Sequence, residues 1–188
     1  PRTRERRLPQ ILSVEEVRRL LDAVADNPKR HALLITVYCA GLRVSEVVRL
    51  KPGDIESDPS RMLIRIDQGK GKKDRYTILT NDCLAALRSY YRSCRPSGSW
   101  LFPGREPGRP WSTSTAQKIY NAAKKKTGLT RGHGIHTLRH CFATHQLQQG
   151  CDIFVLQRLL GHTSIKTTVK YLHLTPERLA RLKSPLEP

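Results

Sequence analysis

The stretch from His136 to Tyr171 contains the feature that most constrains the fold, because glycines divide it into three short helical elements. His136 and Arg139 stand three positions apart, so they share one face of the first predicted helix, which stops at Gly150. Gly161 ends the second helix, and the third element leads to Tyr171. Three short elements thus deliver a cationic fork, imidazoles and a phenol, a set that suits phosphate chemistry.

Taken singly, these side chains have ordinary structural explanations. A tyrosine near a helix end usually packs with its hydroxyl in water, and a lone arginine usually forms a surface ion pair. The spacing of His136, His140 and His145 could suggest a metal site, but no HExxH motif is present and no carboxylate falls at ligand spacing. We therefore expect no metal, and only the joint pattern can decide the function.

Composition points to a polyanionic partner. The 188 residues contain 34 Lys plus Arg against 16 Asp plus Glu, a formal charge of +18, which draws nucleic acid first and acidic membrane second. The 5 cysteines form no CxxC pair, which favours free thiols in a reducing compartment. No apolar run approaches the roughly 20 residues that span a bilayer. We expect one cytoplasmic, nucleoid-associated domain that binds DNA and no membrane.

The N-terminal part is predicted to be helical. Residues 1–10 form a basic arm or linker without periodicity. Ser13 and Glu16 have the spacing of a capping box, and an amphipathic helix follows them. Residues 31–40 are almost wholly apolar, which predicts a buried helix that stops at Gly41.

Arg43 lies directly after this buried helix and before another apolar run, so it is expected close to the core. Arginine is seldom buried without an anion partner. Glu46 could be that partner, and a bound phosphate is the alternative. Both can hold if Glu46 orients a guanidinium that keeps other donors free.

Two strands rich in β-branched residues are predicted at 62–66 and 76–79. The glycine-punctuated, lysine-rich segment GKGKKD joins them and includes Lys70. Such a segment is usually a solvated loop, but it can also carry a lysine into a groove and onto a phosphate. It is not a Walker A loop, because its GK is followed by Gly.

Further helices are predicted at 82–92, from Ser112 or Ser114 onward, and from Thr175 to the C-terminal end. The second of these ends in Lys124–Lys126, which suits the negative end of the helix dipole and could contact a DNA backbone. The predicted fold class is therefore mainly α with a small antiparallel β-sheet inserted early, an α+β arrangement.

Six side chains can be read as one site: Arg43, Lys70, His136, Arg139, His162 and Tyr171. With this set the chain resembles the tyrosine recombinase (phage integrase) family, especially its bacterial chromosome-dimer-resolving and transposon-borne members. The matching strings are GLRVSE, GKGKKDR, HTLRHCFATH, LLGH and TTVKYLH. Arg139 and His162 are 23 positions apart, and His162 and Tyr171 are nine apart.

The resemblance implies the catalytic-domain fold of DNA breaking-rejoining enzymes over residues 11–175, after the arm at 1–10. It also implies that residues 176–188 form a C-terminal helix or tail that could be exchanged between subunits of a tetramer on paired DNA sites. Family members usually add an N-terminal domain that clamps DNA. The chain would then be an excised catalytic domain or a minimal protein.

The resemblance further implies a role for each side chain. Tyr171 would attack a DNA phosphodiester, form a 3′-phosphotyrosyl bond and free a 5′-hydroxyl. Arg43 and Arg139 would clamp the non-bridging oxygens, and Lys70 would protonate the leaving 5′-oxygen. Two permanently charged arginines can replace metal ions, so the reaction would need no metal, ATP or other cofactor.

His136 would act as the acid-base group facing the tyrosine, because a phenol of pKa about 10 needs a neighbouring acceptor. His162 would hydrogen-bond the phosphate. The expected DNA-backbone contacts are Lys72, Lys73, Arg75, Lys118, Lys124 and Lys125.

Three alternatives stay open. A type IB topoisomerase shares this chemistry but would relax supercoils without paired sites. A non-catalytic DNA-binding regulator would keep the basic surface without turnover. A metal-dependent nuclease would require grouped carboxylates, which the sequence lacks.

Overall fold

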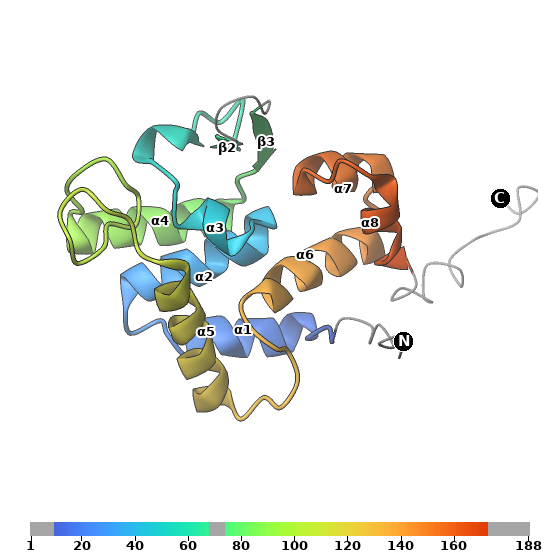
Figure 1. The fold of residues 1–188 in the computed structure, drawn as a ribbon, viewed down its shortest axis with the longest axis horizontal. Coiled ribbons are helices and arrows are strands. Elements are labelled where there is room, and N and C mark those ends of the chain that lie inside the picture. Colours follow the sequence, from blue (N-terminus) through green and yellow to red (C-terminus); the bar gives the residue numbers. More distant parts are fainter. Residues whose placement is uncertain (1–9, 68–73, 173–188) are drawn as a thin grey trace, which may run out of the picture.

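The computed structural model describes residues 10–67 and 74–172, and within them the fold is mostly helical with one small antiparallel sheet (Figure 1). The predicted fold class is confirmed. None of the described helices has the length and apolar character needed to cross a bilayer. The elements are α1 (Val14–Asp22), α2 (Pro28–Ala40), α3 (Val44–Val47), the 3-10 turn η1 (Pro52–Asp54), β1 (Ile55–Glu56), β2 (Leu63–Ile66), β3 (Arg75–Ile78), α4 (Asn81–Cys94), α5 (Thr113–Thr127), α6 (His136–Gln148), α7 (Ile153–Leu160) and α8 (Ile165–Val169).

Side-chain caps set the starts of the first two helices. At α1 the predicted capping box is confirmed: the Ser13 hydroxyl accepts from the Glu16 N–H at 3.1 Å, and the Glu16 carboxylate accepts from the Ser13 N–H at 2.8 Å. The Asn27 side chain caps α2, which consequently begins three residues earlier than the apolar run predicted. Gly41 ends α2 in the left-handed conformation with φ +63°, as expected for a helix stop.

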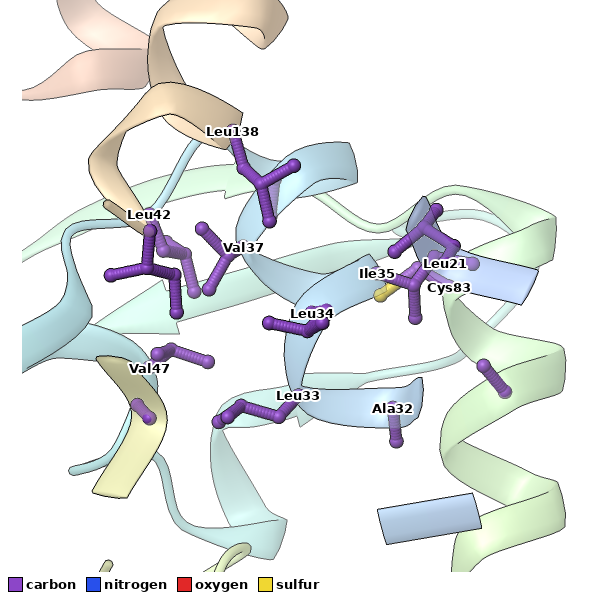
Figure 2. Close-up of a cluster of buried hydrophobic side chains, with 14 of the residues drawn as sticks. Leu21, Ala32, Leu33, Leu34, Ile35, Val37, Leu42, Val47, Cys83 and Leu138 are labelled. Atoms are coloured by element: carbon purple, nitrogen blue, oxygen red, sulfur yellow. The ribbon is translucent and has the colours of Figure 1, made fainter. Parts of the chain in front are cut away.

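The buried helix α2 forms the centre of the main hydrophobic core. Leu33, Leu34 and Val37 of this helix are at most 1% exposed. They belong to one cluster with Cys83 of α4 and Leu138 of α6 (Figure 2). Since α2 packs against both α4 and α6, its carboxyl end and the loop after it are held firmly.

The sheet projects from the helical part between α3 and α4 (Figure 1). β2 lies between β1 and β3 and is antiparallel to both, with Ile64 paired to Ile55 on one side and to Thr77 on the other. The sequence predicted β2 and β3 but not β1, because a two-residue strand shows no periodicity. Residues 68–73, which join β2 to β3, lie outside the described part.

Helix α6 divides its apolar residues between two cores. Leu138 and Cys141 belong to the main core, whereas Phe142 and Leu147 belong to a smaller cluster with α7 and Tyr171. Arg139 follows Leu138 on the same helix and is itself buried, so α6 carries a charged side chain into the protein interior. The buried members of the smaller cluster are Phe142, Ala143, Leu147, Leu156, Leu160 and Tyr171.

Candidate active site

Arg43 is held at the start of α3 by its own helix. Its backbone N–H and its Nη1 donate to the two carboxylate oxygens of Glu46 at 2.7 and 2.8 Å. Its Nη2 donates a longer bond of 3.4 Å to the carbonyl of Gly161. The side chain remains 37% exposed, so part of the guanidinium still faces solvent and can receive an anion.

Arg139 is buried in the second turn of α6, with only 4% of its surface exposed. Its Nη1 donates to the Gly41 carbonyl and its Nη2 to the Leu160 carbonyl, both at 2.6 Å. Burial and the neighbouring Arg43 lower the pKa of Arg139 to about 10, which leaves it charged at neutral pH. The residue therefore joins the ends of α2 and α7 while it supplies a fixed positive charge.

Glu46 is the carboxylate that these arginines share. Arg75 forms a two-point contact with it, at 2.8 Å to Oε1 and 3.0 Å to Oε2, and Arg139 lies 3.8 Å from Oε2. Burial alone would raise the pKa of Glu46, but the hydrogen bonds and charges of Arg75 and Arg43 lower it below its ordinary value. We call Arg43, Arg75, Arg139 and Glu46 together the arginine cluster.

His162 lies just after α7, where Gly161 turns the chain back toward Arg139. Its Nε2 is 3.1 Å from Arg139 Nη2, and its Nδ1 is 2.9 Å from the hydroxyl of Thr168. A guanidinium only donates, so Nε2 is the acceptor and Nδ1 carries the proton. Burial and the nearby arginines lower the pKa of His162 to about 4, which keeps the ring neutral at physiological pH.

Tyr171 follows α8 and is 5% exposed. Its hydroxyl lies 2.9 Å from His140 Nδ1, and its ring stacks on the His162 ring at a centroid distance of 6.5 Å. Burial raises the pKa of Tyr171, and Arg139 and Arg43 oppose that change. Both groups of the His140–Tyr171 pair are neutral, because burial and the nearby His136 lower the pKa of His140 to about 4.

The group in contact with the tyrosine thus differs from the sequence-based expectation. We expected His136 to face Tyr171, but the contact in the structure is made by His140, one helical turn further along α6. His136 is the first residue of α6 and is exposed. Partial desolvation of its ring and the charges of Arg139 and Arg43 lower its pKa. A spacing of four positions puts His136 and His140 on one side of the helix. This spacing was the feature of the sequence that made His140 a second candidate for the contact with Tyr171.

The arginine cluster opens into a cleft of about 1260 Å³. Arg43, Arg75 and His162 line one part of it, and Lys51 and Trp100 line another. Residues of β2 and β3, Ile66 and Arg75, and the end of α7 border the cleft. The lining also includes Glu46 and three aspartates, so the cleft is basic only on balance, and its arginines are the groups suited to a phosphate-bearing ligand.

The predicted DNA contacts are distributed unevenly. Lys118 and Lys125 are exposed on α5, whereas the Nζ of Lys124 donates to the Thr130 carbonyl at 3.1 Å. Arg75 is only 11% exposed and faces Glu46. Lys70, Lys72 and Lys73 lie outside the described residues, as does the predicted helix from Thr175.

The histidine array that could have suggested a metal is occupied by other contacts. His140 binds Tyr171, and His145 hydrogen-bonds the hydroxyl of Tyr38 at 2.9 Å and the carbonyl of Leu12 at 3.1 Å. Over residues 10–67 and 74–172, no group of three or more His, Cys, Asp or Glu side chains could hold a metal ion.

Three contributions to the site were not predicted from the sequence. They are the contact of His140 with Tyr171, the contact of Thr168 with His162 and the two-point pairing of Arg75 with Glu46. Each of these contacts joins separate elements except the Thr168 bond, which closes the short loop before α8. Only the His140 contact had a signal in the sequence, its spacing of four positions from His136, and that signal did not choose between the two histidines.

The fold and the site together describe a helical domain in which a cleft lined by arginines lies near a buried tyrosine and two neutral histidines. Comparison with known sequences places the chain within that class. The profile of the Phage integrase family matches residues 10–178. The chain therefore belongs to the phage integrase family.

Individual relatives agree with this assignment. The y4qK protein of Sinorhizobium fredii (strain NBRC 101917 / NGR234) is 44% identical over 181 residues, which cover 96% of this chain and 58% of y4qK. The crystal structure of XerA recombinase is similar with a TM-score of 0.83 and 33% identity, over 98% of this chain and 68% of that one.

A third similar protein is the XerH site-specific recombinase, whose structure was solved bound to a palindromic difH substrate in a post-cleavage complex. Its TM-score is 0.80 with 25% identity, over 95% of this chain and 54% of that chain. The present chain thus spans little more than half of y4qK and XerH, and about two thirds of XerA.

Proposed function

We propose that the chain is the catalytic part of a site-specific DNA recombinase that cleaves and rejoins strands through a covalent 3′-phosphotyrosine at Tyr171. The observation that supports this most is the convergence of Arg43, Arg139, His162 and Tyr171 from separate elements on one site. Two fixed positive charges beside a phenol are what a phosphoryl transfer to tyrosine requires.

In the proposed reaction the Tyr171 oxygen forms a bond to phosphorus and the bond from phosphorus to the 5′-oxygen breaks. The phenol passes its proton to the neutral imidazole of His140, whose Nδ1 lies 2.9 Å from the Tyr171 hydroxyl, and Lys70 supplies a proton to the leaving 5′-oxygen. Arg43 and Arg139 stabilise the charge that accumulates on the non-bridging oxygens. The phosphodiester energy is retained in the phosphotyrosine, so rejoining needs neither ATP nor a metal.

The histidines are proposed to act by hydrogen bonding and proton transfer. His162 would contact the phosphate, which requires its Nε2 to gain a proton, because in the DNA-free structure that atom accepts from Arg139. His136 is exposed next to the arginines and can exchange protons with an incoming group. A bound phosphate brings negative charge, which raises the pKa of both rings.

Double-stranded DNA is the proposed partner, which the similarity to the DNA-bound XerH recombinase supports. Lys118 and Lys125 on α5 would contact the backbone with the lysines at 70, 72 and 73, and Lys124 would add a weaker contact. Binding by such contacts weakens steeply with salt. We further propose that subunits assemble as a tetramer on paired sites, at the nucleoid in the cytoplasm.

A type IB topoisomerase-like relaxation activity is the main alternative, because it uses the same chemistry. It would relax supercoils without a second site, whereas a recombinase exchanges strands only between two. A non-catalytic DNA-binding regulator is the other alternative, and it would form no covalent bond to DNA.

The test uses a pool of nicked random-sequence duplexes, incubated with the chain in the presence of EDTA and then denatured. We expect a covalent protein–DNA adduct that disappears in Tyr171→Phe and persists in Tyr91→Phe, which alters an exposed tyrosine on α4. Sequencing the trapped DNA identifies the target. An adduct that survives in Tyr171→Phe would assign the nucleophile elsewhere, and the absence of any adduct would favour the regulator.

A further inference from the structure

Arg75, the first residue of β3, has its guanidinium directed into the protein. Its Nη1 and Nη2 donate to the two oxygens of Glu46 at 2.8 and 3.0 Å, and its Nε donates to the Leu159 carbonyl at 3.1 Å. The side chain is 11% exposed. Because Nη1, Nη2 and Nε are all hydrogen-bonded, the guanidinium has a single orientation. A lysine, with one ammonium group, could not reproduce these contacts.

We propose that Arg75 is a positioning residue for phosphoryl transfer, acting through Glu46 on the phosphate-binding arginines. This inference rests on the proposed function, and it gives Arg75 a role other than the direct DNA contact predicted from the sequence. The argument has three steps, which concern charge, orientation and the connection to α7.

The first step is the charge that the cluster presents to a phosphate. Three guanidiniums and one carboxylate have a net charge of +2, and Arg75 supplies the charge that offsets Glu46 most directly. Without Arg75 the same site would have a net charge of +1, with a less compensated carboxylate beside the incoming phosphate. Arg75 thus leaves the charges of Arg43 and Arg139 available for the phosphate.

The second step is orientation. Both oxygens of Glu46 are occupied on one side by Arg75 and on the other by the Nη1 and backbone N–H of Arg43. A carboxylate bound on two sides cannot rotate to follow either arginine. Glu46 consequently fixes the Arg43 guanidinium with its remaining donors toward the cleft.

The third step is the connection to α7. The Leu159 carbonyl bound by Arg75 lies in the last turn of α7, two residues before Gly161. An added Cβ at Gly161 would lie 2.6 Å from the Cδ of Arg75, so the two residues pack tightly. Because α7 faces β3 (Figure 1), Arg75 ties the strand after the Lys70 segment to the loop of His162.

The two roles for Arg75 predict different kinetics. If Arg75 contacted DNA directly, its loss in Arg75→Met would weaken DNA binding, and saturating DNA would restore the rate. A positioning role lowers the rate of adduct formation at saturating DNA while the half-saturating DNA concentration changes little. Loss of a residue that orients a metal ligand typically costs about 10- to 100-fold in activity. Arg75 orients Glu46 in a comparable way, and we expect a loss of that size.

The experiment compares Arg75→Met, Arg75→Lys and the control Arg61→Met on the duplex that the unaltered chain traps. Arg61 also pairs with a glutamate, Glu56 at 2.9 Å, but it lies in the turn between β1 and β2, at the end of β2 opposite the Ile66–Arg75 pair. We expect Arg75→Met and Arg75→Lys to lose rate at saturating DNA and Arg61→Met to keep it. A normal rate in Arg75→Lys would show that charge alone suffices and would overturn the proposal.

A second measurement separates this inference from the proposed function. Inorganic phosphate is titrated into the 188-residue chain while the arginine Nε–H signals are followed by NMR. We expect Arg75→Met to weaken phosphate binding about tenfold, in line with the loss of an outer-shell partner, and Arg61→Met to leave it unchanged. If Arg75→Met only lowers the melting temperature, with phosphate affinity unchanged, the proposal is wrong. This titration decides the role of Arg75 even if no DNA adduct forms.

Discussion

The arginine cluster and the segment that carries Tyr171 are neighbours, but they are held by different means. The cluster joins the end of α2, α3, β3, α6 and α7 through many ionic and backbone hydrogen bonds, and Arg139 alone binds two main-chain carbonyls at 2.6 Å. Tyr171 follows a helix of only five residues, and its hydroxyl is held by one bond to His140.

The difference indicates which half of the site would already be assembled before the proposed DNA substrate binds. Charged groups that are already oriented need no reorganisation when a phosphate binds, which is how electrostatic stabilisation works best. Tyr171, the proposed nucleophile, belongs to the smaller hydrophobic cluster with α6 and α7, so a change in its position disturbs few buried contacts. Four predictions test or sharpen this contrast.

Removal of Arg139 should have the largest effect. Arg139→Met leaves two buried carbonyls without donors, each costing about 1–3 kcal/mol, so the free energy of unfolding should fall by about 2–6 kcal/mol. Urea denaturation measures the change. Arg18→Met, which removes an exposed pair with Glu15, should lower it by less than about 1 kcal/mol. Equal losses in both variants would mean that the bonds from Arg139 to the ends of α2 and α7 do not stabilise the fold.

A methyl group at Gly161 should have the next largest effect. Gly161 and Gly128 have nearly the same backbone angle, φ +62° and +67°, but a Cβ at Gly128 would meet no atom within 4 Å. Gly128→Ala should therefore cost only the left-handed backbone strain, about 1–2 kcal/mol.

Gly161→Ala should cost this strain plus the displacement of Arg75, about 1–3 kcal/mol more, as expected for overpacking. The difference between the two thermal unfolding midpoints isolates the contact with Arg75. Identical midpoints would show that Arg75 gives way freely, and the cluster would then be less rigid than we describe.

Acid should destabilise the junction between the two regions. His140 and His162 have a pKa of about 4 in the folded chain against an ordinary 6.5, so between these pH values the unfolded chain binds protons that the folded chain does not. Stability is thus fully present above pH 6.5 and decreases toward pH 4. A shift of this size is worth about 3 kcal/mol per group without screening, and because both rings are partly exposed, solvent screening should reduce the total for the two groups to about 2 kcal/mol. Urea midpoints at pH 7 and 4.5 measure this loss.

The matched variant is His162→Gln, which should show a shallower pH dependence than the unaltered chain. An unchanged slope would mean that His162 titrates normally and is not held neutral by Arg139.

Loss of the hydrogen bond to Tyr171 should have the smallest effect. His140→Leu removes a bond worth about 1 kcal/mol, so the amide of Tyr171 should exchange about five times faster with solvent. Amides of α2, such as that of Leu34, should exchange as before. His133→Leu, at an exposed position, is the control. Faster exchange throughout the chain would contradict the view that Tyr171 is held locally.

Much of the fold could be predicted from local patterns. The capping box at Ser13, the glycine stop at Gly41 and the apolar run before it each act within a few residues, and the structure confirms all three. β1 was missed because two residues have no pattern, and α2 begins early because Asn27 caps it.

Four of the predicted site residues, Arg43, Arg139, His162 and Tyr171, lie together in the structure, but their contacts could be predicted only in part. The sequence offered Glu46 as one of two partners for Arg43, with a bound phosphate as the alternative, and the structure shows the Arg43–Glu46 pair at 2.8 Å. It did not identify His140 as the partner of Tyr171, 31 positions away, because His136 and His140 share a helix side and only packing chooses between them.

The sequence by itself determined where helices begin and end, which side chains carry positive charge and which motifs indicate the family, because these depend on neighbouring residues and composition. Only the tertiary structure decided that Arg75 turns inward to Glu46, 29 positions away, and that Arg139 spans the ends of α2 and α7. The physical reason is that a guanidinium takes the acceptors that folding brings within reach, and burial makes those contacts obligatory.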